Sequence, residues 1–311
     1  MSQFNYTIII PHYNIPSLLE RCISSIPQRN DIQIIVIDDC SPNSQELRTT
    51  IEKIKSIKNL EFYKTDSGGS AGRARNIGLD HAQGKWLLFA DADDFFAPCL
   101  SNVMDQYLNA QEDVIYFNFK SVLSNNISIN SNRESVYSNF FDQYDKDHKE
   151  ENFRFLYCTP WGKMIKRTLI EKNQIRFDET RYANDAMFAT LIGCKAKSIL
   201  PINIPVYVLT ERAESLANKF CQKPGETAIR TKVALRVRKT IIEHGYTFDY
   251  NYQIYIRILL WNKEYKDLLE IYRNISDYNL TKHDVLKIVY QTGIRYYLIY
   301  LWLIWKDIFH M

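Results

Sequence analysis

The chain has 311 residues, of which 46% are hydrophobic and 24% are charged, and its formal net charge at pH 7 is +3. This composition excludes a disordered or fibrous protein, and the small charge, with Lys and Arg scattered among Asp and Glu, disfavours nucleic acid as a partner. Six cysteines lie far apart without a C-x-x-C pair, which disfavours a zinc site and a disulfide framework and fits a reducing compartment.

The first 120 residues alternate short apolar runs with amphipathic helical patterns. Strands are predicted at 6–10, 32–37, 60–63, 86–89 and 114–119. Helices are predicted around 18–26, 47–57, 73–83 and 100–108, with Gly84 as a helix C-cap. Repeated units of this kind predict a parallel sheet with helices on both faces.

The remainder of the chain is less regular. The Asn- and Ser-rich segment 121–147 is interpreted as a loop or insertion. Between 153 and 210 we predict a helix at 168–173 and a strand at 206–209, and the chain beyond Pro224 is predicted to be mainly helical.

Three carboxylates, Asp91, Asp93 and Asp94, follow the apolar strand 86–89. Ligands of open α/β sheets bind at the carboxyl ends of the strands. A cluster of acids there is costly unless a cation lies among them, and Mg²⁺ or Mn²⁺ bridging to a phosphate is the usual solution. An acidic turn that caps the next helix is the alternative interpretation.

Two other predicted strand ends carry polar groups that suit a nucleotide. Asp39 can accept a hydrogen bond from a base N–H, Tyr13 can stack on the base, and Asp91 can hold ribose hydroxyls. Arg75 follows the Gly-rich turn 67–72, where it and helix N-terminal amides can face phosphate, although a surface salt bridge is the alternative. The turn matches neither G-x-G-x-x-G nor a P-loop, which disfavours a dinucleotide or ATP fold.

Together these segments resemble the family 2 glycosyltransferases of bacterial polysaccharide biosynthesis, over about residues 5–216. The segments that carry the resemblance are Ile8–Asn14, Val36–Ser41, Gly72–Gly84, Leu88–Asp94, Trp161–Lys163, Arg176–Glu179 and Asn184–Phe188. The implied fold is α/β of the GT-A type, a Rossmann-like, mostly parallel sheet with helices on both faces and a C-terminal helical extension. The implied parts are a nucleotide-sugar-binding half (1–120), an acceptor-binding half (121–220) and a helical region (221–311).

The resemblance also implies roles for individual residues. The residues implied to hold the nucleotide-sugar donor are Pro11, Tyr13, Asp39, Gly72, Arg75, Asp91, Ala92, Arg212 and Ser215. The residues implied to hold Mn²⁺ or Mg²⁺ are Asp93 and Asp91, and those implied to contact the acceptor are Trp161, Lys163 and Asn184. A place for Trp161 in the core is the alternative.

The implied mechanism is inverting, with Asp185 as the general base. Asp185 aligns with the second acid of the family's usual E-D pair, whereas Asn184 replaces the first acid. A second departure is Cys40, which stands where the family usually has glycine. Both departures bear on contacts that the sequence alone does not identify.

The implied activity is that of a hexosyltransferase, which moves a sugar from a nucleotide-sugar, chiefly a UDP-sugar, to a hydroxyl group of a growing glycan or lipid-linked oligosaccharide. One alternative is a catalytically silent nucleotide-sugar-binding subunit of a glycan assembly complex, which Asn184 favours. The other is a sugar-phosphate nucleotidyltransferase, which is disfavoured because no Gly-rich loop follows Ile10.

The termini bear on localisation. No signal peptide is recognised, since the apolar run of residues 8–10 stops at Pro11, and we expect a cytoplasmic protein. Ten apolar residues at 296–305 are too few to cross a bilayer, which takes roughly 20. Their Tyr and Trp side chains and the nearby basic residues predict either a docked helix or a peripheral contact of segment 294–311 with the inner face of the cell membrane.

Overall fold

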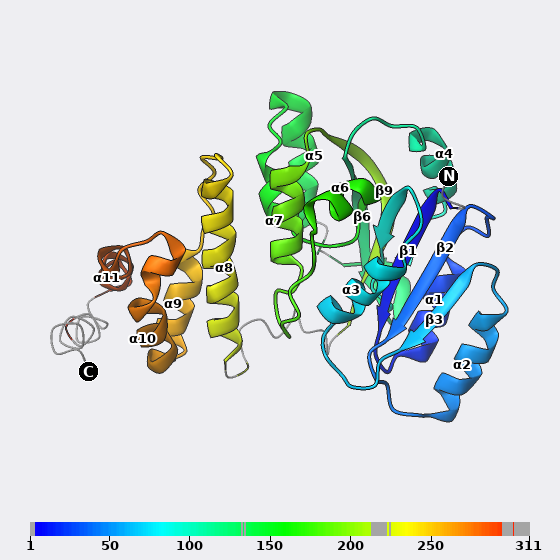
Figure 1. The fold of residues 1–311 in the computed structure, drawn as a ribbon, viewed down its shortest axis with the longest axis horizontal. Coiled ribbons are helices and arrows are strands. Elements are labelled where there is room, and N and C mark those ends of the chain that lie inside the picture. Colours follow the sequence, from blue (N-terminus) through cyan, green and yellow to red (C-terminus); the bar gives the residue numbers. More distant parts are fainter. Residues whose placement is uncertain are drawn as a thin grey trace. The chain divides into compact units, whose positions relative to one another are not determined.

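The computed structural model describes residues 4–131, 133, 135–212, 223, 225–293 and 301. Its contacts divide the chain into two compact units, Met1–Ala213 and Glu214–Met311. The first unit contains a sheet with helices on both sides, and the described part of the second is helical (Figure 1).

One sheet organises the first unit. Its strands are β1 (Tyr6–His12), β2 (Ile32–Asp38), β3 (Leu60–Lys64), β4 (Trp86–Phe89), β5 (Phe95–Phe96), β6 (Val114–Leu123), β7 (Asn126–Asn130), β8 (Lys163–Lys166) and β9 (Ile199–Glu211). The strand order is β3-β2-β1-β4-β8-β6-β9-β5, and β7 pairs with β6. The half β3-β2-β1-β4 is parallel, whereas β8 runs antiparallel between β4 and β6.

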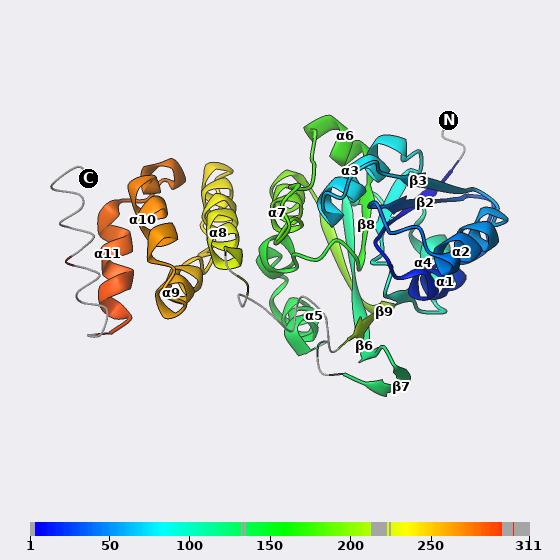
Figure 2. The same cartoon turned by 90° about the horizontal axis from the view of Figure 1, so that it is seen from below.

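The helices of the first unit cover both faces of the sheet. They are α1 (Pro16–Ser24), α2 (Gln45–Lys55), α3 (Ala71–His81), α4 (Leu100–Tyr107), α5 (Ser135–Asp147), the π-helix η1 (Asn152–Leu156), α6 (Arg167–Asn173) and α7 (Ala186–Lys195). The chain moves outward from β1 to β3 and then returns to β4. Because crossovers between parallel strands are right-handed, α3 lies on the face opposite to α1 and α2 (Figure 2).

The predicted fold class is confirmed, and the strands explain why. All seven residues of β2 are buried, and β1 is buried at six of its seven positions, as expected of central parallel strands covered on both faces. Both strands run further than predicted, to His12 and Asp38, and therefore carry polar side chains into the edge of the core.

Two local predictions are wrong. Gly84 does not cap a helix, because α3 ends at His81; a Cβ on Gly84 would overlap the backbone of β1, and close approach is the reason for glycine there. The segment 121–147 is not a loop, since it forms the end of β6, then β7 and α5. The many polar residues of this segment obscure a pattern of aromatic side chains at helical spacing. One of these aromatic residues, Phe141, is 1% exposed.

The second unit has a hydrophobic core of its own. Its described helices are α8 (Glu226–Glu243), α9 (Gln253–Trp261), α10 (Tyr265–Arg273), the 3-10 helix η3 (Ile275–Tyr278) and α11 (Lys282–Gln291), and the prediction of a helical C-terminal region is confirmed. Within the described ranges, none of the helices combines the length and the apolar character that a bilayer crossing requires. The predicted membrane-contact segment 294–311 lies outside the described residues, Leu301 excepted.

Candidate active site

The candidate site lies where the strand order reverses. Strand β1 pairs in parallel with β2 on one side and with β4 on the other. The two crossovers leave on opposite faces of the sheet, and such a reversal opens a crevice at the carboxyl ends of the strands. Tyr13, Asp39 and Asp91 follow these three strand ends, as the sequence predicted.

Tyr13 and Asp39 are held in different ways. The Tyr13 side chain is 58% exposed, whereas the Asp39 carboxylate accepts hydrogen bonds from the Gly69 N–H at 3.0 and 3.2 Å. The turn after Asp39 needs Cys40 at φ = 62°, in the left-handed region that favours glycine. Pro11 lies within β1 and is partly buried.

The Gly-rich turn leads into α3. Ser70 caps this helix, because its Oγ accepts a hydrogen bond from the Arg73 N–H at 3.2 Å. Gly72 is buried in the first turn, and a Cβ there would overlap the carbonyl oxygen of Asp178. Packing therefore accounts for this glycine, and its contact with a donor stays a prediction.

The carboxylate turn after β4 is anchored through Asp94, which is 1% exposed. Its Oδ1 accepts a hydrogen bond from the Thr210 N–H at 2.6 Å, and its Oδ2 accepts one from the Tyr207 hydroxyl at 2.9 Å. The same hydroxyl oxygen accepts the Asp91 N–H at 2.9 Å. Trp161 stacks on the Tyr207 ring at a centroid distance of 4.9 Å and is 4% exposed, which favours the core position left open by the sequence.

The other two acids of the turn pair with arginines. Asp91 Oδ1 lies 2.6 Å from Arg75, and Asp93 Oδ2 lies 2.5 Å from Arg212. Burial and the neighbouring Asp91 raise the pKa of Asp93, and Arg212 opposes them. Ala92 lies between the two acids and is 3% exposed. The turn therefore concentrates more negative charge than its surroundings neutralise.

Arg75 connects this turn to the residues just before α7. Its guanidinium bonds Asp91 and also donates to Asn184 Oδ1 at 3.0 Å, and it lies 5.3 Å from the centre of the Phe177 ring. The residue is 5% exposed, so the alternative of a surface salt bridge is wrong. Asn184 thus has a defined partner in the position of the missing acid.

Asp185 immediately precedes α7 and is partly buried. Burial raises the pKa of its carboxyl group, while the nearby Arg75 lowers it. A hydrogen bond from its own backbone N–H also lowers the pKa of this carboxyl group. A carboxyl group whose pKa is raised is better matched to accept a proton near neutral pH.

Lys163 begins β8 and is 3% exposed. Its ammonium donates to the carbonyl oxygens of Tyr157, at 2.8 Å, and of Thr159. Burial lowers the pKa of Lys163 to about 7. Lys163 therefore fixes the loop before β8, and direct contact with an acceptor stays a prediction.

The donor set fits a divalent cation that is shared with a diphosphate. Among the described residues, no three acidic, His or Cys side chains gather as a self-sufficient metal site. Asp91 and Asp93 pair with their arginines through one carboxylate oxygen each, and hard oxygen ligands suit Mg²⁺ or Mn²⁺. Burial and, after it, the charge of Asp91 raise the pKa of Asp93, and a cation beside the two acids would oppose both effects. The predicted Ser215 lies outside the described residues.

Sequence reasoning missed the residues of other elements that hold the carboxylate turn after β4 in place. Tyr207 and Thr210 lie on β9, and Arg21 of α1 donates to the Asp93 carbonyl oxygen and covers the Phe95 ring at 5.3 Å. The apolar run 206–209 predicted a strand, but it did not indicate that this strand contacts the carboxylate turn. Nothing in the local pattern distinguishes Arg21 from a surface residue.

Comparison with known proteins gives concordant matches. Residues 7–173 match the family description "Glycosyl transferase family 2". The chain is 22% identical over 251 residues to the poly(ribitol-phosphate) beta-N-acetylglucosaminyltransferase TarS of Staphylococcus aureus, covering 78% of this chain and 42% of TarS. It is 23% identical over 263 residues to the glycosyltransferase GlyA of Streptococcus pneumoniae, covering 81% of this chain and 37% of GlyA. The chain thus spans less than half the length of these relatives.

Solved structures share the fold. Residues 1–349 of S. aureus TarS in complex with UDP-GlcNAc align with a TM-score of 0.62 at 20% identity, covering 88% of this chain and 73% of that chain. The mannosyltransferase PcManGT from Pyrobaculum calidifontis, in complex with GDP-Man and Mn²⁺, aligns with a TM-score of 0.54 at 16% identity, covering 95% and 78%.

Proposed function

The chain belongs to the family 2 glycosyltransferases, and on that basis we propose that it transfers a hexosyl group from a nucleotide-sugar to a hydroxyl group of a growing glycan. The observation that carries the proposal is the Arg75 bridge, which joins the donor-side acid Asp91 to Asn184, next to Asp185. Asp91 and Asp185 are close enough for the charge of Asp91 to raise the pKa of Asp185. The UDP-GlcNAc complex of TarS favours a UDP-sugar as the donor.

The donor half has the groups that a nucleotide requires. Exposed Tyr13 stacks on the base, Asp39 accepts a base N–H, and Asp91 holds the ribose. Further donor contacts are assigned to Pro11, Gly72, Arg75, Ala92, Arg212 and Ser215. Arg212, which pairs with Asp93, would also balance the charge of a diphosphate.

Asp93 and Asp91 would hold the Mn²⁺ or Mg²⁺. When bound, the ion supplies a Lewis acid that stabilises the negative charge of the departing diphosphate. The protein contributes the two carboxylates, a turn fixed by Asp94, and arginines that limit repulsion between the acids.

Asp185 acts as the general base. It removes the proton from the acceptor hydroxyl as that oxygen attacks the sugar carbon, and the nucleotide diphosphate departs from the opposite face. One base and one leaving group give a single displacement, so the sugar configuration inverts. The raised pKa of Asp185 brings the carboxylate closer to the basicity needed at neutral pH.

The acceptor is assigned to the second half of the first unit, with Trp161, Lys163 and Asn184 shaping its site. We retain the division into 1–120 for the donor, 121–220 for the acceptor and 221–311 as a helical region. We also propose a cytoplasmic location, with a lipid-linked oligosaccharide as one form of acceptor and segment 294–311 as a candidate contact with the membrane surface.

Thermal unfolding with UDP-, GDP-, CMP- and dTDP-sugars, each with Mn²⁺ or with EDTA, tests the donor and the metal. A ligand at about 100 times its Kd should add about 2.7 kcal/mol to the stability of the folded state. We expect stabilisation by a UDP-sugar that is lost in EDTA. Absence of a shift with every nucleotide-sugar contradicts the proposal.

Asp185→Asn tests the base. We expect the variant to fold and to bind the donor but to transfer no sugar, because the amide cannot accept the proton. Glu171→Gln, an exposed acid on α6, is the control and should transfer normally. Undiminished turnover by Asp185→Asn would remove Asp185 from this role, and a wild-type chain that binds donor without turnover would favour the silent subunit.

A further inference from the structure

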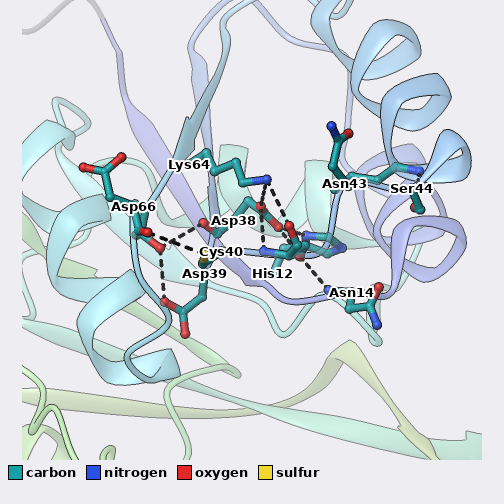
Figure 3. A network of polar contacts seen from close by, with 12 residues as sticks. His12, Asn14, Asp38, Asp39, Cys40, Asn43, Ser44, Lys64 and Asp66 are labelled. Atoms are coloured by element: carbon teal, nitrogen blue, oxygen red, sulfur yellow. Dashed lines mark hydrogen bonds and ion pairs between the residues drawn. The ribbon is translucent and has the colours of Figure 1, made fainter.

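A buried histidine–carboxylate pair joins the ends of β1 and β2. His12 Nδ1 lies 2.7 Å from Asp38 Oδ1, and both side chains are fully shielded from solvent. Figure 3 shows the two side chains pointing toward one another, with Lys64 of β3 nearby at 3.8 Å from Asp38 Oδ2. Neither residue has a role in the proposed transfer. Burying two ionisable groups at the ends of two strands is costly, so their presence needs an explanation.

The hydrogen bonds define the state of the His12 ring. Its Nε2 accepts the Ile15 N–H at 3.2 Å, so this nitrogen carries no proton. The proton therefore lies on Nδ1 and is donated to Asp38. Burial alone would raise the pKa of Asp38, but the hydrogen bonds from His12 and Ser41 outweigh it and hold this pKa below its usual value.

Ser41 extends the network to the next turn. Its hydroxyl donates to Asp38 Oδ1, and its N–H donates to Asp38 Oδ2 at 3.1 Å. The Ser41 Oγ also accepts the Asn14 N–H at 2.7 Å. Asn14 and Ile15, the two residues after Tyr13, are thus both fixed through their backbone by the His12–Asp38–Ser41 network.

The two residues proposed to contact the base each directly follow a member of this pair. Tyr13 follows His12, and Asp39 follows Asp38. The two turns are also joined directly, because the Asp39 N–H donates to the His12 carbonyl oxygen at 2.8 Å. Each turn contains a residue at positive φ, Asn14 at 51° and Cys40 at 62°, which an unsupported chain would rarely adopt.

We propose that His12 and Asp38 are positioning residues for the donor nucleotide, which set the separation of Tyr13 and Asp39 before the base arrives. The inference rests on the proposed function, since it assumes that these two residues hold a nucleotide. His12 and Asp38 act through the turns and touch no substrate. A preformed pair of turns reduces the ordering that binding must supply.

Two substitutions at His12 separate its two hydrogen bonds. His12→Asn keeps an N–H near the Nδ1 position for Asp38 and loses the acceptor for Ile15. His12→Gln reaches the Nε2 position with its carbonyl and loses the bond to Asp38. Each removes one anchor, and we expect nucleotide affinity to fall about tenfold, as loss of one buried hydrogen bond allows.

Calorimetric titration with UDP, GDP, CMP and dTDP in Mn²⁺ measures this effect, and steady-state kinetics should show it in the donor KM with kcat within about twofold. Thr7→Val is the matched control. Its Oγ1 donates to Gln33 Oε1 at 2.7 Å between the same two strands, at their amino ends. This variant should lose stability and keep wild-type affinity.

Three outcomes are distinguishable. Weaker binding by both His12 variants, with normal binding by Thr7→Val, supports the inference. Nucleotide affinity within twofold of wild type in both His12 variants, with only a lower Tm, overturns it and leaves the proposed function standing. A wild-type chain that binds none of the four nucleotides contradicts both. If the His12 variants do not fold, Ser41→Ala replaces them. It removes the acceptor of the Asn14 N–H and leaves the hydrogen bond between His12 and Asp38 in place.

Discussion

Two buried carboxyl groups of the first unit, Asp38 at the end of β2 and Asp94 in the turn after β4, have pKa values that are shifted in opposite directions. Asp38 is 0% exposed and has a lowered pKa, whereas Asp94 is 1% exposed and has a pKa well above its usual value. Burial acts on both in the same direction. Other groups must therefore decide the difference.

The hydrogen bonds that the two carboxylates have in common do not explain the difference in pKa. Each carboxylate accepts one from a backbone N–H and one from a hydroxyl group. Asp38 adds His12 and has Lys64 within 3.8 Å. Asp94 has two acids of its own turn beside it, and Asp93 and Asp91 both raise its pKa after burial. The negative charge at the ends of β1 and β2 is thus balanced by neighbouring groups. The carboxylate turn has an excess of negative charge, which would favour a bound cation.

The largest effect should come from Asp38→Ala. This change leaves three buried donors, from His12 and Ser41, without their acceptor. Because each unsatisfied buried donor costs about 1–3 kcal/mol, we expect a loss of about 3–5 kcal/mol in the free energy of unfolding. Urea denaturation measures it. A loss below about 1 kcal/mol, the net worth of one ordinary hydrogen bond, would contradict the view that this end is a fully used network.

Tyr207→Phe tests the anchoring of the carboxylate turn. It removes the hydroxyl that serves both the Asp91 N–H and Asp94 Oδ2, and we expect a loss of about 1–3 kcal/mol together with weaker donor binding. Tyr157→Phe is the control, since its hydroxyl donates to the Phe117 carbonyl oxygen at 2.8 Å. Equal effects of the two variants on donor affinity would separate Tyr207 from the site.

The pH dependence of stability should differ in sign between the two regions. A raised folded-state pKa, as for Asp94, gives stability that is highest below the unfolded value near 3.9 and falls as pH rises through the folded value. The lowered pKa of Asp38 gives stability that is lost as pH falls through the folded value.

Asp94→Asn and Asp38→Asn isolate these contributions. Relative to wild type, Asp94→Asn should gain stability as pH rises from 4 to 8, because the amide does not ionise, whereas Asp38→Asn should lose it as pH rises from 3 to 5. Urea denaturation across the pH range measures both. Parallel profiles for the two variants would refute the contrast.

The smallest effect should come from Cys40→Gly. A non-glycine residue in the left-handed region costs roughly 1–2 kcal/mol, and glycine returns part of this through its greater entropy in the unfolded chain. We expect a gain of up to about 1 kcal/mol in the free energy of unfolding, seen as a higher Tm. A lower Tm would show that the contact of the Cys40 Sγ with the Asp66 carbonyl oxygen, at 3.7 Å, outweighs this gain.

Local pattern was sufficient for the frame of the fold. Apolar runs that end in polar residues gave β1, β2 and β4, and the rule that ligands bind at strand ends brought Tyr13, Asp39 and Asp91 to one edge. Prediction from local pattern was wrong at α5, where a polar composition obscured aromatic residues at helical spacing. It was also wrong at Gly84, where glycine allows close packing and does not cap a helix.

The amino-acid sequence by itself determined where β1 to β4 lie along the chain, the family, and the acids at the strand ends, because local patterns of residues carry all three. Only the tertiary structure decided the partners. Arg75 meets Asn184 across 109 positions, and Asp91 meets Tyr207 across 116. Such contacts, and the pKa values that follow from them, depend on which distant segments are packed together, and no local periodicity encodes that.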